Sequence, residues 1–381
     1  MNWLVVLPAL ALLAPARPGI ERFDAYRARL EGRGAGIVAH HASRAGEEHA
    51  VDFLSRRGTR LLRVFAPEHG FRGEAEAGEP VGDYRDARSG LPVISLYGKK
   101  KGPSAADLEG IEVMIFDVQD VGVRFYTYLS TLHHVMEACA ANGVPLLVMD
   151  RPNAHAAYVD GPVSREGFRS FVGMHPVPVV YGMTIGEYAR MINGEGWLPG
   201  GARCDLTVIP CENWRRGDPV PWRVAPSPNL PDPVSVMLYP SLCFFEGTVV
   251  NEGRGTLTPF QVFGHPDLAG MPYRYVPRPI AGMSRSPKCA GQTCRGMDLR
   301  DQYLPVREGK RLNLSWLLAA WRAYRGEAPF FLPFFDLLAG NDALRREIIA
   351  GKTEEEIRAS WQQELADFSR VRQRYLLPEY D

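Results

Sequence analysis

The sequence lacks an excess of charge of either sign. Its 381 residues include 44 Lys and Arg and 44 Asp and Glu, so the formal net charge is zero. A protein that binds nucleic acid through its overall field carries surplus cations, so we expect no nucleic-acid partner, and any cationic site must be local. Hydrophobic residues make up 45% of the chain, which is enough to bury a core and argues against intrinsic disorder.

Long apolar segments are also absent beyond the N-terminus. The apolar run at 3–13 is too short to span a bilayer comfortably, and Ala14-Pro15-Ala16 follows it. This pattern resembles the apolar region and small-residue cleavage site of a secretory signal peptide. We therefore expect residues 1–16 to be a signal peptide, and the protein to be exported to the periplasm or the extracellular space without a stable membrane anchor.

Cysteine is scarce, with six residues, and none of them follows a metal-binding pattern. Neither close pair has C-x-x-C spacing, and the sequence contains no H-x-x-x-H or H-E-x-x-H motif, so we expect no metal. In an exported chain, Cys289 and Cys294 are expected to form a structural disulfide, and Cys204 and Cys211 form a second candidate pair.

The sequence also lacks the common cofactor and nucleophile motifs. No G-x-G-x-x-G opens a helix after the first predicted strand, and no G-x-x-x-x-G-K-[ST] occurs, so dinucleotide and nucleotide phosphates are not expected ligands. A serine hydrolase is disfavoured because no G-x-S-x-G is present. We expect no cofactor.

The N-terminal half instead alternates short apolar runs with helical stretches. The predicted strands are 36–39, 61–66, 91–96, 113–118 and 145–149, and the predicted helices are 47–57, 127–142 and 185–193. Continuous apolar strands that alternate with helices indicate a parallel sheet covered on both faces. After residue 206, short strands and loops are expected until helices at 313–324, 342–350 and 353–370.

The sequence therefore predicts an α/β fold. We expect a Rossmann-like parallel-sheet N-terminal domain at 17–200 and a smaller α+β C-terminal domain at 201–381.

Polar or glycine clusters follow four of the predicted strands. They are PEHG (67–70), LYG (96–98), DVQDVG (117–122) and DRPN (150–153). In open parallel sheets, ligands bind beyond the carboxyl ends of the strands, so these clusters predict a site at one edge of the sheet. Three polar loops of the second half, at 226–229, 246–248 and 251–256, are further candidates, and the glycines of 251–256 allow close approach to a ligand.

These segments resemble a known family. The strings FAPEHGFRG (65–73), FDVQDVGVRFYTY (116–128), PSPNLP (226–231), FEGT (245–248) and NEGRGT (251–256) are similar to those of the NamZ-type exo-β-N-acetylmuramidases, glycoside hydrolases long catalogued as a domain of unknown function. The resemblance covers essentially the whole mature chain. It implies an active cleft between the two domains and release of N-acetylmuramic acid from the non-reducing end of peptidoglycan fragments, as in cell-wall recycling. A non-catalytic protein that binds muropeptides or other sugars is the alternative.

Glycosidic cleavage usually requires two carboxyl groups. Glu68 directly follows a predicted strand, where burial would favour the protonated, proton-donating form, so we predict it to be the general acid. Glu252 is the predicted second catalytic carboxyl, with Glu246 as its competitor, although Glu246 at a predicted strand end can equally pair with Arg254. For Glu187, three residues after Thr184, we prefer a helix-capping role.

The remaining candidates are predicted to bind substrate. Arginines in the motif loops can bind the lactyl carboxylate of muramic acid, unless they pair with motif acids. Tyrosines can pack on sugar faces, and the other polar groups can hydrogen bond to hydroxyl or acetamido groups. The predicted set is His69, Arg72, Tyr97, Asp117, Asp120, Arg124, Tyr126, Asn229, Glu246 and Arg254.

Overall fold

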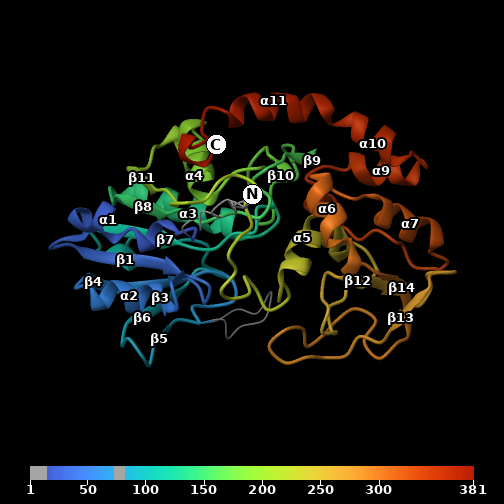
Figure 1. Ribbon diagram of the computed structural model, residues 1–381, viewed down its shortest axis with the longest axis horizontal. Coiled ribbons are helices and arrows are strands. Elements are labelled where there is room, and N and C mark those ends of the chain that lie inside the picture. Colours follow the sequence, from blue (N-terminus) through green and yellow to red (C-terminus); the bar gives the residue numbers. More distant parts are fainter. Residues whose placement is uncertain (1–14, 73–81) are drawn as a thin grey trace, which may run out of the picture.

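The computed structural model describes residues 15–72 and 82–381, in two lobes (Figure 1). The first lobe contains a seven-stranded sheet in the order β11-β8-β7-β1-β4-β6-β5. Six strands are parallel, and β5 at the edge runs antiparallel to β6. The bounds are β1 (Gly34–Ala39), β4 (Arg60–Ala66), β5 (Tyr84–Arg85), β6 (Pro92–Ser95), β7 (Val113–Asp117), β8 (Leu146–Met149) and β11 (Leu206–Ile209). The predicted fold class is confirmed.

Helices cover both faces of this sheet, as the unbroken apolar strands require. Every residue of β1 and β7 is buried, and successive side chains point to opposite faces: Ile37 packs in one core and Val38 in the other. The first face is covered by α1 (Phe23–Leu30) and α2 (Ala50–Arg56), and the second by α3 (Tyr128–Asn142) and α4 (Ile185–Gly194). The predicted capping box of Thr184 and Glu187 opens α4.

The order of the strands reverses at β1. The chain proceeds from β1 to β4 and β6 on one side, and then crosses to β7, β8 and β11 on the other. Ligand sites of open α/β sheets lie at such a switch point, beyond the carboxyl ends of the strands. The clusters that follow β4, β6 and β7 are therefore brought to one edge of the sheet.

The second lobe combines a three-stranded antiparallel sheet with short helices. The strand order is β12-β14-β13, with bounds β12 (Val262–His265), β13 (Tyr273–Tyr275) and β14 (Cys294–Asp298). The helices are α5 (Pro233–Leu242), α6 (Tyr303–Gly309), α7 (Ser315–Ala323), α8 (Phe334–Ala339), α9 (Ala343–Ile349), α10 (Glu354–Ser360) and α11 (Gln362–Arg372). Two hairpins complete the fold: β2 (Arg44–Ala45) with β3 (Glu48–His49), and β9 (Asp160–Val163) with β10 (Pro178–Val180).

The sequence-based prediction missed α5, since only strands and loops were expected there. Its start carries a clear signal: Asp232 accepts a hydrogen bond from the backbone N–H of Ser235, and Pro233 occupies the first turn. The strand predicted to end near Glu246 was also wrong, because Cys243–Gly247 is a 3₁₀ helix. The strand β11 pairs with β8, so the sheet extends past the predicted domain boundary at residue 200.

The last helix ties the two lobes together. In Figure 1, α11 (red) runs back from the second lobe to the first and ends near α4. There the Tyr380 hydroxyl donates to Asp150 at 2.7 Å, at the carboxyl end of β8. Arg358 of α10 also pairs with Asp160 of β9 at 2.8 Å. These links fix the position of one lobe against the other.

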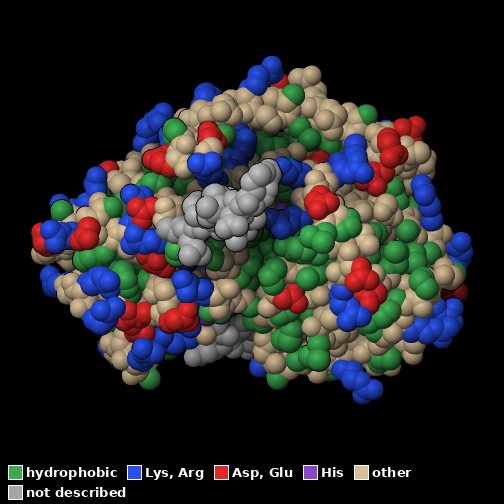
Figure 2. Space-filling view, in the orientation of Figure 1, with side chains coloured by type: hydrophobic (Ala, Val, Ile, Leu, Met, Phe, Trp, Pro, Cys, Tyr) green, Lys and Arg blue, Asp and Glu red, His purple; other side chains and the backbone are tan. Residues whose placement is uncertain are grey.

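Charged side chains of both signs intermix over both lobes (Figure 2), as the balanced composition requires. No helix within the described ranges is long and apolar enough to cross a membrane. The predicted signal-peptide run at 3–13 lies outside the described residues.

All six cysteines are free thiols, so neither predicted disulfide is present. Cys289 and Cys294 are neighbours whose side chains hydrogen bond to each other. Cys204 lies in the main core and Cys211 lies in a separate small core with Trp214 and Tyr380, so this second pair is not brought together.

Candidate active site

A cavity of about 740 Å³ is lined by segments of both lobes. The loops that follow the sheet strands contribute Glu68, His69, Tyr97, Lys101, Tyr126 and Thr127. Later segments contribute Asn229, Glu246, Glu252, Arg254, Arg285 and Lys288. The volume lies in the range of roughly 300 to 1,000 Å³ that is usual for ligand sites. The sequence clusters at the sheet edge and the glycine-rich loops thus face the same space.

Glu68 lies directly after β4, and its side chain is half-buried rather than buried. The Thr127 hydroxyl donates to Oε2 of Glu68 at 2.6 Å, and the next residue, Tyr128, donates to its backbone carbonyl at 3.5 Å. Burial, with the Glu68 carboxylate close by, raises the pKa of Tyr97. Three hydroxyl groups therefore lie near Glu68: that of Tyr97, which follows β6, and those of Thr127 and Tyr128 at the start of α3.

The chain takes a special backbone conformation just after Glu68. His69 has a φ of 72°, in the left-handed region that non-glycine residues rarely adopt. Gly70 follows with a φ of 76° and donates its N–H to the carbonyl of Pro67. This turn directs the Glu68 and His69 side chains to the cavity, which explains why a proline and a glycine bracket them.

Glu252 is held in a different environment on the facing wall. Its side chain is only 2% exposed, and it lies between two cations, with Nε of Arg254 at 3.2 Å from Oε1 and Nζ of Lys288 at 2.8 Å from Oε2. Besides this ion pair with Lys288, Oε2 accepts no hydrogen bond from the described residues. This oxygen is thus a buried acceptor in the wall of the cavity.

The loop that carries Glu252 is fixed by backbone pairing. Asn251 and Gly264 of β12 exchange two backbone hydrogen bonds of 2.8 Å, and the Glu252 carbonyl accepts from Phe260 at 2.8 Å. Gly253 and Gly255 have φ values of 84° and 80°, so glycine is needed at both positions. The acid is therefore presented by a rigid turn rather than by a free loop.

Glu246, predicted as the alternative second acid, pairs with Arg254, as the sequence suggested. Both Nε and Nη2 of Arg254 donate to its Oε1, at 3.1 and 2.6 Å. Arg254 therefore bridges Glu246 and Glu252, and it holds both acids at the cavity wall.

Tyr126 and Asn229, which were also predicted to bind substrate, line the cavity at the proline-rich loop 226–229. The Tyr126 hydroxyl donates to the carbonyl of Pro226 at 2.9 Å, and the Asn229 amide donates to the carbonyl of Met283 at 2.7 Å. The Asn229 side chain is 2% exposed, and its carbonyl oxygen has no donor among the described residues. Asn229 is therefore a fixed part of the cavity wall.

Two family models together cover most of the chain. Residues 35–234 match the model described as "Exo-beta-N-acetylmuramidase NamZ, N-terminal", and residues 237–377 match its C-terminal counterpart. The chain is also 36% identical to the peptidoglycan β-N-acetylmuramidase NamZ of Bacillus subtilis, over 92% of this chain and 88% of that protein. The chain belongs to the NamZ family of exo-β-N-acetylmuramidases. The resemblance read from the sequence is confirmed, and family membership makes this chain a glycoside hydrolase.

Solved structures of this family share the fold. A DUF1343 family protein from Bacteroides fragilis is 39% identical and superposes with a TM-score of 0.89, covering 96% of this chain and 99% of that one. A second DUF1343 protein from the same organism is 27% identical, with a TM-score of 0.77 and coverage of 95% and 98%.

Four residues predicted to bind substrate lie outside the cavity. Arg72 makes two 2.8 Å hydrogen bonds to Asp86 and lines a separate surface pocket. Arg124 is fully buried and donates to the carbonyls of Leu338 and Ala339 at 3.0 Å. It therefore links the two lobes and does not contact a ligand in the cavity. Neither arginine is placed to bind a lactyl carboxylate in the NamZ cavity.

Asp117 and Asp120 are likewise buried within the first lobe. Asp120 accepts from the Tyr181 hydroxyl and from the N–H of Gly122, and burial raises its pKa to about 6. Asp117 accepts from Nε and Nη2 of Arg151 at 2.7 and 2.8 Å. Asp117 is the last residue of β7 and Asp120 lies in the loop after it, but both side chains are buried in the protein.

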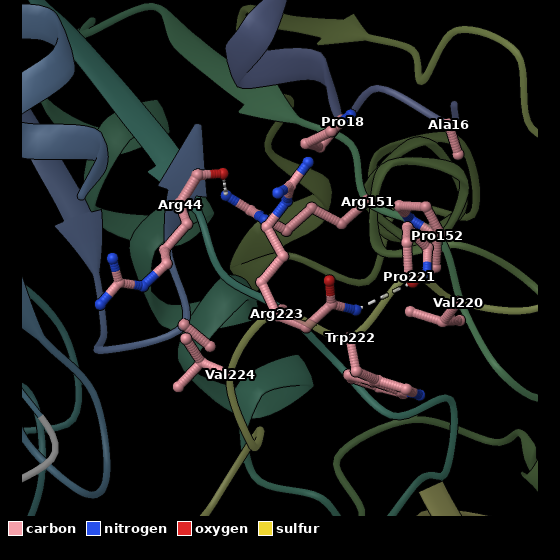
Figure 3. A pocket seen from close by; sticks show the side chains of 12 residues that line it. Ala16, Pro18, Arg44, Arg151, Pro152, Val220, Pro221, Trp222, Arg223 and Val224 are labelled. Atoms are coloured by element: carbon pink, nitrogen blue, oxygen red, sulfur yellow. Dashed lines mark hydrogen bonds between the residues drawn. The ribbon is translucent and has the colours of Figure 1, made fainter. Parts of the chain in front are cut away.

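Arg151 connects Asp117 to a small cavity of about 40 Å³, which Arg44 and Trp222 also line (Figure 3). Its guanidinium donates to the carbonyl of Arg44 at 2.9 Å, and Arg223 also lines the space. A hexosamine cannot fit in this volume. The Asp117–Arg151 pair therefore serves to hold the strand ends in place.

The sequence did not predict several cavity residues, among them Thr127, Lys101, Arg285 and Lys288. Thr127 lies between two tyrosines of the family string FYTY. Its role depends on the contact of its hydroxyl with Glu68, which is known only from the packing of α3 against the loop after β4. Lys288 is anchored to the carbonyls of Phe245 and Thr248 at 2.6 and 3.1 Å. Lysines in loops are common, so no local signal distinguishes Lys101 or Lys288.

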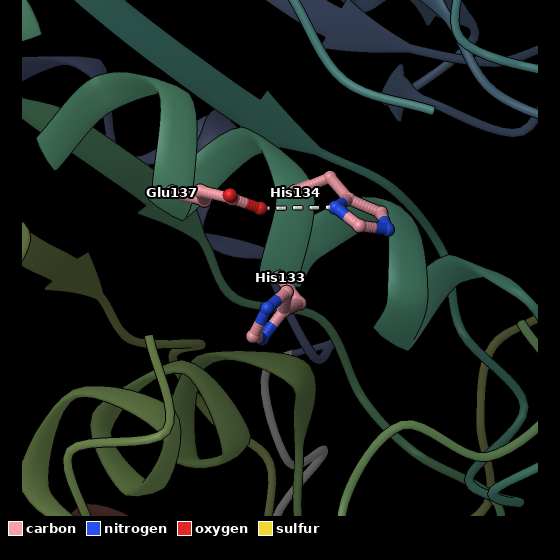
Figure 4. Close-up of side chains that lie close together, drawn as sticks. All are labelled: His133, His134 and Glu137. Carbon is pink, nitrogen blue, oxygen red and sulfur yellow. Dashed lines mark hydrogen bonds and ion pairs between the residues drawn. The ribbon is translucent and has the colours of Figure 1, made fainter. Parts of the chain in front are cut away.

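One group of potential metal ligands occurs among the described residues: His133, His134 and Glu137 on α3 (Figure 4). Nδ1 of His134 contacts Glu137 at 3.1 Å, and Nδ1 of His133 contacts Nε2 of His175 at 2.9 Å. Each ring thus already has a protein partner on one nitrogen. His133 and His134 line a neighbouring cavity, and none of the three residues lines the cavity of Glu68 and Glu252.

Proposed function

We propose that this protein is an exo-acting β-N-acetylmuramidase that removes N-acetylmuramic acid from the non-reducing end of peptidoglycan fragments. The observation that carries the proposal is the pair of acids from opposite lobes, Glu68 and Glu252, which line one 740 Å³ cavity in a chain of the NamZ family. Glycosidic cleavage usually uses two carboxyl groups around the scissile bond, and the cavity supplies them.

Glu68 acts as the general acid in this proposal. Thr127 fixes one carboxylate oxygen of Glu68 through its 2.6 Å hydrogen bond, and Glu68 lines the cavity in which the leaving group would lie. Protonation of the glycosidic oxygen removes the need to expel an alkoxide, and such general acid help contributes roughly 10² to 10⁴-fold in rate.

Glu252 supplies negative charge to the oxocarbenium-like transition state. The neighbouring Arg254 and Lys288 hold it in place, one at each carboxylate oxygen. A charge fixed before the reaction stabilises developing positive charge without reorganisation cost. Arg285 adds positive charge at the cavity wall, which suits the lactyl carboxylate of a bound muramic acid.

The direct test is hydrolysis of a chromogenic β-linked N-acetylmuramide by the purified protein between pH 5 and 8. Release of the chromophore, with no release from the matching N-acetylglucosaminide, is the expected result. Binding of muropeptides without any release over this range would contradict the proposal and favour the sugar-binding alternative.

We also propose that the protein works outside the cytoplasm, as the signal-peptide pattern at 1–16 suggests. A chain that starts at Arg17 keeps the pairing of this residue with Glu212, through two backbone hydrogen bonds of 2.8 Å and a side-chain ion pair. Mass spectrometry of protein from the periplasm or culture medium should show a start at Arg17. Recovery of only the full-length chain in the cytosol would contradict export.

A further inference from the structure

A second cavity, of about 590 Å³, adjoins the catalytic one. Lys101 and Phe171 line both, so these two side chains form the wall that the cavities share. The Lys101 ammonium lies 4.0 Å from the ring centroid of Phe171 and 5.0 Å from that of Tyr97. The second volume is also within the usual range for a ligand site, roughly 300 to 1,000 Å³.

The charge of this second cavity differs from that of the first. Among the described residues, its lining includes Lys101, Arg169 and three histidines, and no aspartate or glutamate. Burial, together with His134 and Arg169 nearby, lowers the pKa of His133 to about 4, so this ring is neutral near pH 7. The permanent charge therefore comes from Lys101 and Arg169, and it suits an anionic ligand.

The same cavity presents aromatic rings whose positions are fixed. Trp197 stacks on His175 with ring centroids 4.6 Å apart and an interplanar angle of 18°. His175 is itself held by His133 at 2.9 Å and by the Tyr188 hydroxyl at 3.0 Å. Two rigid rings, Trp197 and Phe171, next to two cations form a surface that matches a sugar ring carrying a carboxylate.

We infer that the second cavity binds the next N-acetylmuramic acid residue of the glycan chain, with its lactyl carboxylate at Arg169 and Lys101. This inference rests on the proposed function. Muramic acid alternates with N-acetylglucosamine in peptidoglycan, so a chain cut at its non-reducing end continues through one neutral glucosamine into a second muramic acid. The shared wall of the two cavities then separates two anionic sugars of one substrate.

The test compares two peptide-free substrates, the disaccharide MurNAc–GlcNAc and the tetrasaccharide MurNAc–GlcNAc–MurNAc–GlcNAc, in initial-rate assays. The wild-type kcat/KM should be about tenfold higher for the tetrasaccharide, because one charge-assisted contact is added. Arg169→Ala and Trp197→Ala should each remove most of this preference while leaving disaccharide kcat/KM unchanged. Arg29→Ala, at an exposed position of α1, is the matched control and should leave both values unchanged.

A third substrate isolates the carboxylate. A tetrasaccharide whose inner lactyl group is methyl-esterified should be cleaved like the disaccharide, and Arg169→Ala should not affect its rate. Equal losses on disaccharide and tetrasaccharide, or no dependence on chain length in the wild type, would overturn the inference. A tetrasaccharide that carries stem peptides is assayed in parallel: an effect of Arg169→Ala on this substrate alone would also overturn the inference and would assign the cavity to the stem peptide. Failure of the wild type to cleave even the disaccharide would instead contradict the proposed function.

Discussion

The two walls of the catalytic cavity hold their acids in opposite ways. Glu68, at the end of a sheet strand, is half-buried beside the hydroxyls of Thr127 and Tyr97. Glu252, on a glycine turn of the second lobe, is 2% exposed and lies between Arg254 and Lys288. Two carboxyl groups placed in such different surroundings can take different roles, one as a proton donor and the other as a fixed negative charge.

The largest effect is expected from the proton donor. Glu68→Gln keeps the shape of the side chain but removes its transferable proton, so kcat on the natural disaccharide should fall by roughly 10² to 10⁴-fold. A nitrophenyl substrate needs little protonation, so its loss should be much smaller. The melting temperature should stay close to that of the wild type.

Glu355→Gln, at an exposed position of α10, is the matched control and should change neither rate. Equal losses of Glu68→Gln on both substrates would remove the acid assignment. A large fall in melting temperature would point to a structural role.

Glu252→Gln should affect both activity and folding. The change leaves the Lys288 ammonium and part of the Arg254 guanidinium without their buried partner, which costs about 3 kcal/mol of unfolding free energy. The rate should fall alike for natural and nitrophenyl substrates, since the stabilising charge is lost for both. Urea unfolding and parallel kinetics measure the two effects.

The double variant Glu252→Gln/Lys288→Met separates these effects, because it removes the unpaired cation as well. Stability should recover while activity stays low. Recovery of activity together with stability would show that Glu252 serves only the fold.

Acid should destabilise the protein, mainly through its first lobe, which contains eight of the nine histidines. Burial lowers the pKa of His41 and His155 to about 4 and that of His49 to about 3, so the unfolded chain binds the extra protons. Stability should therefore be lost as the pH falls from about 6.5 to 4, at about 1.4 kcal/mol per unit of pKa difference. Urea midpoints at several pH values measure this.

Two buried acids act in the opposite direction. Burial raises the pKa of Asp120 and Asp150 to about 6, so the stability that they contribute at low pH is lost as the pH rises from about 4 to 6. Asp120→Asn removes the contribution of one of these acids. The free energy of unfolding should then fall more steeply with decreasing pH, because less of the histidine effect is offset. A flat profile, or greater stability at pH 4 than at pH 6.5, would contradict this account.

The smallest effect is expected from the hydroxyl beside Glu68. Thr127→Val removes the 2.6 Å hydrogen bond to Oε2 with little change in shape, and we expect a loss in kcat of about tenfold, or about 1.4 kcal/mol. Thr131→Val, one turn further along α3, is the matched control because that hydroxyl donates only to the helix backbone. Similar losses in the two variants would mean that the effect comes from α3 rather than from Glu68.

The sequence by itself determined the strands, most helices and the family. Apolar runs predicted β1, β4, β6, β7 and β8 within one or two residues, because a strand buried on both faces must be apolar throughout. It also placed Glu68 and Glu252 in motifs that line one cavity. Helix α5 was missed because its cap at Asp232 lies in a loop-rich region whose prolines hid the signal.

Only the tertiary structure decided which motif side chains meet. Asp117, Asp120 and Arg124 belong to the same strand-end string as Tyr126, yet the first three turn inward to Arg151, Tyr181 and the carbonyls of α8. The direction of a side chain at a strand end depends on the turn that follows and on partners far away in the chain. For the same reason, the sequence did not show that Thr127 contacts Glu68, that Lys288 lies beside Glu252, or that a second cationic cavity adjoins the first.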